Sequence, residues 1–191
     1  SAISKLEHEQ KGLTSVERAE IGYFKVVALA RLNKIDDARV LIESLREIDT
    51  SSVFKGLTAA YMQVLDEDYD TAATAVSELR AQAPQNAEVL KLLAQLKLSL
   101  GKPGEAAEIF KDYVQFYPED KQTTFVLAKL LVDVGELTAA EPYIDGLLLI
   151  NDLNPLLNQL KSATYAHKRD FANALKRAEI AIAGGINTPS L

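Results

Sequence analysis

Residues 87–120 read AEVLKLLAQLKLSLGKPGEAAEIFKDYVQFYPED, and this stretch decides the fold. Apolar residues recur three or four positions apart on both sides of Gly101, which predicts two amphipathic helices joined by a short turn. Pro118 near the end of the stretch would prevent the second helix from continuing. The stretch therefore predicts one helix–turn–helix.

Ala106 in this stretch belongs to a set of alanines that recur every 34 residues. We call this set the alanine column: Ala38, Ala72, Ala106, Ala140 and Ala174. A second column of mostly small residues falls on the first helices: Val26, Ala60, Ala94, Ala128 and Ser162. A fixed period of this length is typical of stacked repeats, and small residues allow the two helices of a repeat to cross closely. A third, mostly apolar column falls in the turns: Ile35, Tyr69, Pro103, Leu137 and Phe171.

The period divides the chain into five repeats, at about 19–52, 53–86, 87–120, 121–154 and 155–188. Residues 1–13, with Ala2 and Leu6 before a stop at Gly12, predict the second helix of a preceding repeat. We expect residues 1–191 to form a single all-α domain of about eleven helices, which is a fragment of a longer repeat protein.

Local signals place several helix ends. Thr14 and Glu17 have the spacing of a capping box at the start of the first full helix. Asp36 is expected to cap the next helix, which would begin at Asp37. Turn glycines are present at Gly101 and Gly135, whereas Glu67 and Arg169 occupy the equivalent positions in other repeats.

Composition restricts the function. The chain has a formal net charge of −6 and no basic stripe, which argues against nucleic acid as a partner. It has no cysteine, so disulfides and thiolate chemistry are excluded. No apolar run is long enough to suggest a membrane span.

The sequence contains no convincing catalytic or metal-binding motif. His8 and His167 have no carboxylate or serine at a catalytic spacing and are interpreted as surface residues. The acidic run 66–70 lacks the pattern of a calcium loop and is interpreted as a solvated turn with capping carboxylates. We therefore expect no enzyme activity, no cofactor and no metal.

The two small-residue columns, the Gly101 and Gly135 turns, Phe110 and the closing prolines Pro84 and Pro118 resemble the tetratricopeptide repeat (TPR) family. The resemblance implies a right-handed superhelix of antiparallel helix pairs that binds protein or peptide partners without catalysis. The weaker Ala/Leu-rich style of the later repeats is similar to bacterial repeat lipoproteins that accompany PEP-CTERM/exosortase sorting and exopolysaccharide export.

The resemblance also implies that the first helices line a concave groove. The predicted groove residues are Tyr23, Val27, Phe54, Leu57, Tyr61, Lys91, Gln95, Phe125 and Lys129. They predict a ligand segment that is apolar at one end and acidic or polar at the other. The alternative is that aromatics such as Tyr23 and Phe54 only pack between repeats.

Three settings remain open. One is a scaffold in envelope sorting, secretion or export, with a periplasmic or envelope location. The others are a cytosolic co-chaperone or regulator, and the recognition arm of a larger enzyme. Self-association through the terminal repeats is a further expectation, because the last helix is apolar on more than one side, at Leu175, Ala178, Ile180 and Ile182.

Overall fold

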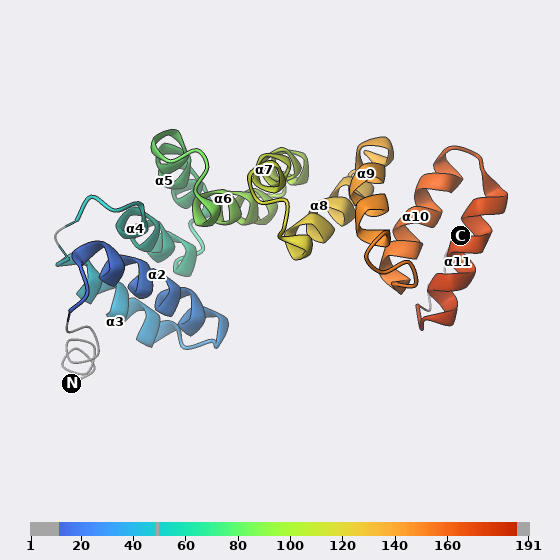
Figure 1. The fold of residues 1–191 in the computed structure, drawn as a ribbon. Helices are drawn as coiled ribbons and strands as arrows, with labels where there is room; N and C mark the ends of the chain where they lie inside the picture. The colour runs from blue at the N-terminus through green and yellow to red at the C-terminus, as the bar shows by residue number, and fades with distance from the viewer. Residues whose placement is uncertain (1–11, 49, 187–191) are drawn as a thin grey trace. The chain divides into compact units, whose positions relative to one another are not determined.

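The computed structural model describes residues 12–48 and 50–186, and this part of the chain contains ten α-helices and no strand (Figure 1). The helices are α2 (Ser15–Arg31), α3 (Ile35–Arg46), α4 (Val53–Leu65), α5 (Tyr69–Gln82), α6 (Ala87–Ser99), α7 (Pro103–Phe116), α8 (Lys121–Asp133), α9 (Leu137–Leu148), α10 (Pro155–His167) and α11 (Phe171–Ala183). The half-repeat expected before Gly12 lies outside the described residues.

The 34-residue period of the sequence is reproduced in the helix boundaries. The second helix of each repeat begins on the apolar turn column: Ile35, Tyr69, Pro103, Leu137 and Phe171. The first helices also end at positions 34 residues apart: Arg31, Leu65, Ser99, Asp133 and His167. Each turn therefore has the same length in all five repeats, as the repeat interpretation requires.

The middle residue of each of these turns has a positive φ. The five residues are Asn33 (57°), Glu67 (58°), Gly101 (69°), Gly135 (84°) and Arg169 (61°). A left-handed residue turns the chain sharply after a helix end, which is why glycine is preferred there. Glu67 and Arg169 adopt the same conformation without being glycine, so the turn geometry is kept where the sequence signal is lost.

The described chain forms two compact units, divided between Leu100 and Gly101. In the first, α2 pairs with α3, α4 with α5, and α6 packs on α5; the neighbouring first helices α2 and α4 also touch. In the second, α8 pairs with α9 and α10 with α11; α7 packs on α8, α9 on α10, and α8 touches α10. A second helix thus contacts both its own first helix and the next one. The single-domain assignment stays a prediction.

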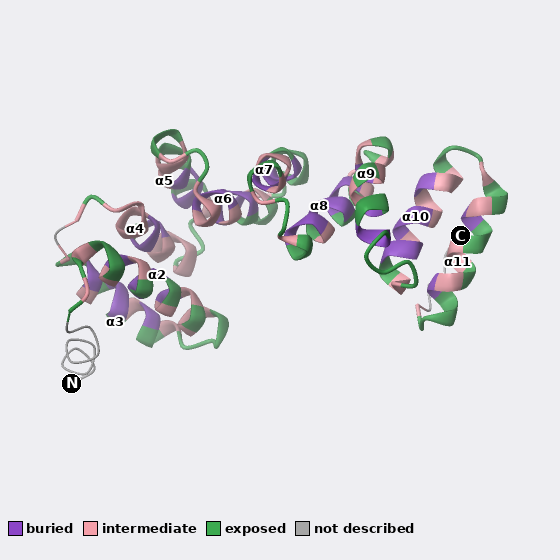
Figure 2. Cartoon of the chain, viewed as in Figure 1, coloured by how far each residue is buried: buried purple, intermediate pink, exposed green. Residues whose placement is uncertain are grey.

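The two small-residue columns lie in the core of each repeat. Ala38, Ala72, Ala106 and Ala140 are fully buried, and Ala174 is nearly so. The columns meet directly in the last repeat, where the Ser162 hydroxyl on α10 donates a hydrogen bond to the Ala174 carbonyl on α11 over 2.8 Å. Larger core side chains surround these contacts, and buried and exposed positions alternate along the helices (Figure 2).

The predicted capping box at the start of α2 is confirmed. The Glu17 backbone N–H donates to the Thr14 hydroxyl over 3.2 Å, and the Glu17 carboxylate accepts from the Thr14 backbone N–H over 2.8 Å. The predicted cap at Asp36 is wrong: α3 begins at Ile35, and Asp36 lies within its first turn. The left-handed turn at Asn33 lets the helix start earlier than the side-chain signal suggested.

Candidate peptide-binding surface

Four aromatic rings gather on α2 and α4 in the first compact unit. The Tyr23 ring centroid lies 5.5 Å from that of Phe24, 5.8 Å from that of Phe54 and 6.3 Å from that of Tyr61. Phe24 and Phe54 are 5.9 Å apart. These distances are typical of favourable edge-to-face and tilted ring pairs. We call Tyr23, Phe24, Phe54 and Tyr61 the aromatic cluster.

Members of the cluster differ in access to solvent. Tyr23 is buried at its centre, and burial raises the pKa of its hydroxyl far above the ordinary value. Burial also raises the pKa of Tyr61, which is half-buried. Phe54 is half-buried and Phe24 is exposed. The cluster thus has a dry anchor and a wet rim, and both tyrosines are neutral at physiological pH.

The remaining predicted groove residues of α2 and α4 are divided in the same way. Val27 is half-buried and Leu57 is completely buried. Tyr23 and Leu57 therefore hold neighbouring first helices together and offer no surface to a ligand. Only Val27, Phe54 and Tyr61 among the predicted groove residues of these two helices keep exposed area.

The polar part of the predicted groove is distributed over both compact units. On α6, Lys91 is half-buried and Gln95 is exposed. On α8, Phe125 is half-buried and Lys129 is exposed. The Lys129 ammonium lies 2.5 Å from the Asp133 carboxylate one turn along the same helix. Such an exposed pair contributes little to stability, so an acidic ligand could replace Asp133 at small cost.

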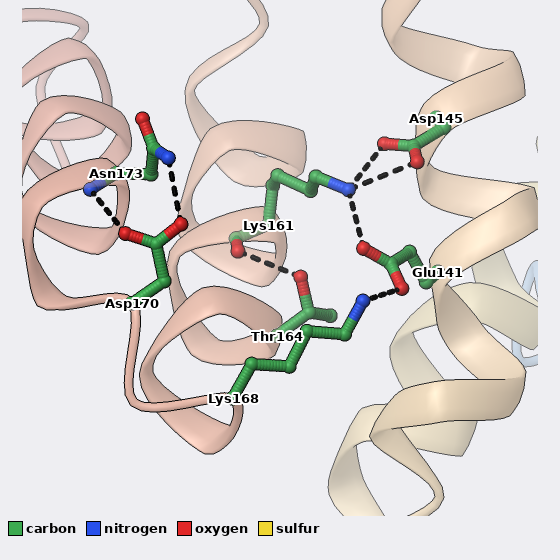
Figure 3. A network of polar contacts seen from close by, with 7 residues as sticks. All are labelled: Glu141, Asp145, Lys161, Thr164, Lys168, Asp170 and Asn173. Carbon is green, nitrogen blue, oxygen red and sulfur yellow. Dashed lines mark hydrogen bonds and ion pairs between the residues drawn. The ribbon is translucent and has the colours of Figure 1, made fainter.

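A buried lysine in the second compact unit was not predicted from the sequence. The Lys161 ammonium on α10 contacts Glu141 over 2.9 Å and Asp145 over 2.7 Å, both on α9. Lys168 at the end of α10 also pairs with Glu141 (Figure 3). The Lys161 ammonium lies 4.9 Å from the centre of the Tyr165 ring as well. Lys161 is thus a charged contact between two consecutive repeats.

The charges in this network sustain one another. Burial opposes the charged form of Lys161, but its hydrogen bonds to Asp145 and Glu141 outweigh burial and raise its pKa. Hydrogen bonds from Lys161 and Lys168 lower the pKa of Glu141. The sequence does hold a signal: the equivalent positions in the three preceding repeats are the apolar Ala59, Leu93 and Leu127. A lysine in an apolar column predicts a buried charge with nearby carboxylates.

The other titratable candidates have ordinary surroundings. His167 is exposed at the end of α10, and His8 lies outside the described residues. In the acidic run 66–70, the Asp68 carboxylate accepts from the Thr71 backbone N–H over 3.2 Å and caps α5, as expected of a capping turn. Within residues 12–48 and 50–186, no three acidic or histidine side chains gather as a metal site would require. None of the helices described is long and apolar enough to cross a bilayer.

Residues 64–122 match the family model described as tetratricopeptide repeat. The chain carries tetratricopeptide repeats. This confirms the resemblance inferred from the small-residue columns, and the predicted all-α solenoid of helix–turn–helix repeats is confirmed with it. No curated protein sequence gives a significant match.

Solved structures share the TPR fold over most of their length. MamA (AMB-1) superposes with a TM-score of 0.69 at 18% identity, covering 90% of this chain and 94% of that chain. YrrB, described as a TPR protein with an unusual peptide-binding site, gives 0.67 at 19% identity and covers 96% and 92%. PilF of Pseudomonas aeruginosa gives 0.68 at 18% identity and covers 91% and 79%. At such identities these likenesses concern the fold alone.

Proposed function

We propose that this chain is a non-catalytic scaffold that binds a peptide or protein segment, with the aromatic cluster on α2 and α4 as its principal contact. The carrying observation is the exposed ring of Phe24 beside the half-buried rings of Phe54 and Tyr61. TPR arrays present the inner faces of their first helices to ligands. The peptide-binding site named for YrrB is in keeping with this role.

The packing of the cluster favours binding energetically. Aromatic side chains lose little conformational entropy when a ligand covers them, and they dominate the energetics of many interfaces. Tyr23 is buried beneath Phe54 and Tyr61, so these rings are already held in place before a ligand arrives. A preorganised apolar surface of this kind suits a segment with one or two large apolar side chains.

The chemistry of the rest of the ligand is inferred from α6 and α8, each taken by itself. Gln95 and Lys91 offer amide and ammonium groups on α6, and Lys129 offers an ammonium on α8 beside Phe125. Acidic or amide side chains in the ligand would match these groups. A role in envelope sorting or export, and a periplasmic location, remain predictions from the resemblance.

A selection from a random peptide library tests the proposal, because it offers the chain every combination of side chains at once. We expect selected peptides to carry large apolar side chains, and their affinity to fall at least tenfold for Phe24→Ser, a loss of about 1.4 kcal/mol. Phe24 is exposed, so its replacement should leave thermal unfolding unchanged. Tyr61→Ala provides a second variant on α4.

Val126→Ser is the matched control, because Val126 is an exposed apolar residue on α8 and does not belong to the aromatic cluster. Equal affinity of wild type and Phe24→Ser for every selected peptide, with Tyr61→Ala also binding normally at native stability, would exclude the cluster as the contact surface.

A further inference from the structure

Consecutive repeats of this chain contact one another through two positions. The first is the fifth residue of each second helix, which we call the forward position: Arg39, Ala73, Ala107, Glu141 and Leu175. The second is the C-cap residue of each first helix, which we call the receiving position: Leu32, Asp66, Leu100, Val134 and Lys168. A receiving residue follows its forward residue by 27 positions, as in Arg39 and Asp66.

The two positions form ion pairs where both are charged. Arg39 lies 2.6 Å from Asp66 and also donates to the Leu65 carbonyl over 3.1 Å, which ties α3 to the end of α4. Glu141 pairs with Lys168 at the end of α10, with the signs of the charges reversed (Figure 3). The same junction is therefore built twice with opposite polarity.

The chemistry of the two positions is matched in every repeat junction. The two charged junctions combine opposite charges, Arg39 with Asp66 and Glu141 with Lys168. The other two combine apolar residues: Ala73 is followed by Leu100, and Ala107 by Val134. Both alanines are buried on helices that pack on the next first helix. Junctions between repeats are thus either charge with opposite charge or apolar with apolar.

One forward and one receiving residue have no such counterpart in the described part of the chain. They are Leu175 on α11 and Leu32 at the end of α2, which are 61% and 69% exposed. Both are leucine, so they fulfil the apolar rule for each other. From this match we propose that a second copy of this chain docks head to tail, with α11 of one copy on α2 of the next, as α9 docks on α10.

Exposure of the two faces supports this docking. On α11, Ile182 is 59% exposed, whereas Leu148 at the same position of α9 is 7% exposed. On α2, Phe24 is 44% exposed, whereas Leu92 at the same position of α6 is 4% exposed. Phe171 on α11 and Ile21 on α2 add further exposed apolar surface. Both faces carry apolar side chains that are covered elsewhere in the array.

The charges beside the two leucines are also complementary. Glu179 stands at the position of Asp145, and Lys25 at the position of Lys161. A junction with the geometry of α9 on α10 would therefore place the Glu179 carboxylate beside the Lys25 ammonium of the next copy, as Asp145 lies beside Lys161. Because the two surfaces differ, the contact is heterologous, and repeated docking gives open chains or closed rings.

The experiment measures the weight-average mass of the 191-residue chain across a wide range of concentrations by light scattering and sedimentation. We expect the mass to rise above the 20.9 kDa of one chain as the concentration increases. Leu175→Glu and Leu32→Lys should each abolish the increase, because each buries a charge against a leucine. Both leucines are exposed, so circular dichroism should show unchanged melting of the monomer.

Mixing the two variants is the decisive step. The Glu at position 175 of one variant would meet the Lys at position 32 of the other, which recreates the natural pair of Glu141 and Lys168. Equimolar Leu175→Glu and Leu32→Lys should therefore associate together although neither does so alone. Leu149→Glu is the control, because Leu149 is 90% exposed and occupies neither position; it should associate as the wild type does.

Three results would overturn the proposal. A wild-type chain that stays at one mass at all concentrations would exclude the junction. Loss of association with Leu175→Glu but not with Leu32→Lys would indicate a symmetric contact of α11 with α11 instead. Failure of the mixed variants to associate would show that the two positions do not meet.

Discussion

The left-handed turn residues allow the repeat geometry to be tested by substitution. Glu67 and Arg169 have φ values of 58° and 61°, and both are exposed. A left-handed backbone costs an ordinary L-residue about 1–2 kcal/mol. Glycine avoids this strain but loses about 0.5–1 kcal/mol more through chain entropy on folding. Replacing either residue by glycine is therefore expected to raise the free energy of unfolding by about 0.5–1 kcal/mol.

Urea and thermal unfolding followed by circular dichroism measure this effect. For a chain of this size, about 1 kcal/mol corresponds to a shift of about 2–4 °C in Tm. The converse change, Gly135→Ala, should lower stability by a similar amount. A Cβ built at Gly135 meets no atom within 4 Å, so its cost comes from backbone strain and not from a clash.

Asn33→Gly serves as the internal control, because asparagine tolerates the left-handed region better than most residues. Its effect should be smaller than that of Glu67→Gly. If Glu67→Gly and Arg169→Gly both lowered stability while Gly135→Ala had no effect, the shared turn geometry would be refuted.

Three further predictions concern packing and charge. Ala106→Leu should overpack a fully buried helix crossing and cost about 1–3 kcal/mol, measured by thermal unfolding; an unchanged melting curve would contradict the crossing. The double change Glu141→Gln with Asp145→Asn should cost about 3–5 kcal/mol, because it leaves the Lys161 ammonium buried without a counter-charge, whereas Lys161→Met should be nearly neutral; urea titrations giving the reverse order would contradict the network. The lowered pKa of Glu141 predicts stability that is present above the ordinary carboxyl pKa of about 4.3 and lost as the pH falls through the folded-state value, so the difference in unfolding free energy between wild type and Glu141→Gln should shrink on acidification; a constant difference from neutral to acidic pH would count against this linkage.

The architecture was predictable from the sequence because repetition makes it redundant. Five copies of one pattern report the same helix starts and ends, so a weak signal in one repeat is corrected by the others. Arg169 illustrates this: its identity argues against a left-handed turn, but its place 34 residues after Gly135 predicts one, and the structure has it. The Asp36 cap failed because a side-chain signal in one repeat was preferred to the column that begins at Ile35.

The binding surface was less predictable, because helical spacing says which face a residue occupies but not what covers it. Tyr23 and Leu57 occupy the expected face, yet both are buried between neighbouring first helices. Phe24 was not among the predicted groove residues and is exposed, because its usual cover at the position of Leu92 in α6 has no equivalent over α2 within the described residues. Which aromatic lies outermost depends on the neighbouring helix and not on the period.

The sequence by itself determined the period, the all-α class, the helix boundaries and the small residues at the crossings, because these follow from short-range geometry repeated five times. Tertiary packing decided which groove residues remain accessible, where the Lys161 charge finds its carboxylates, and how the junction residues of successive repeats match. These outcomes join residues from different helices, and the free energy of each depends on burial that no single helix can fix. For the same reason, the pairing of Leu175 with Leu32 could be inferred only after Arg39 with Asp66 and Glu141 with Lys168 had been seen in contact.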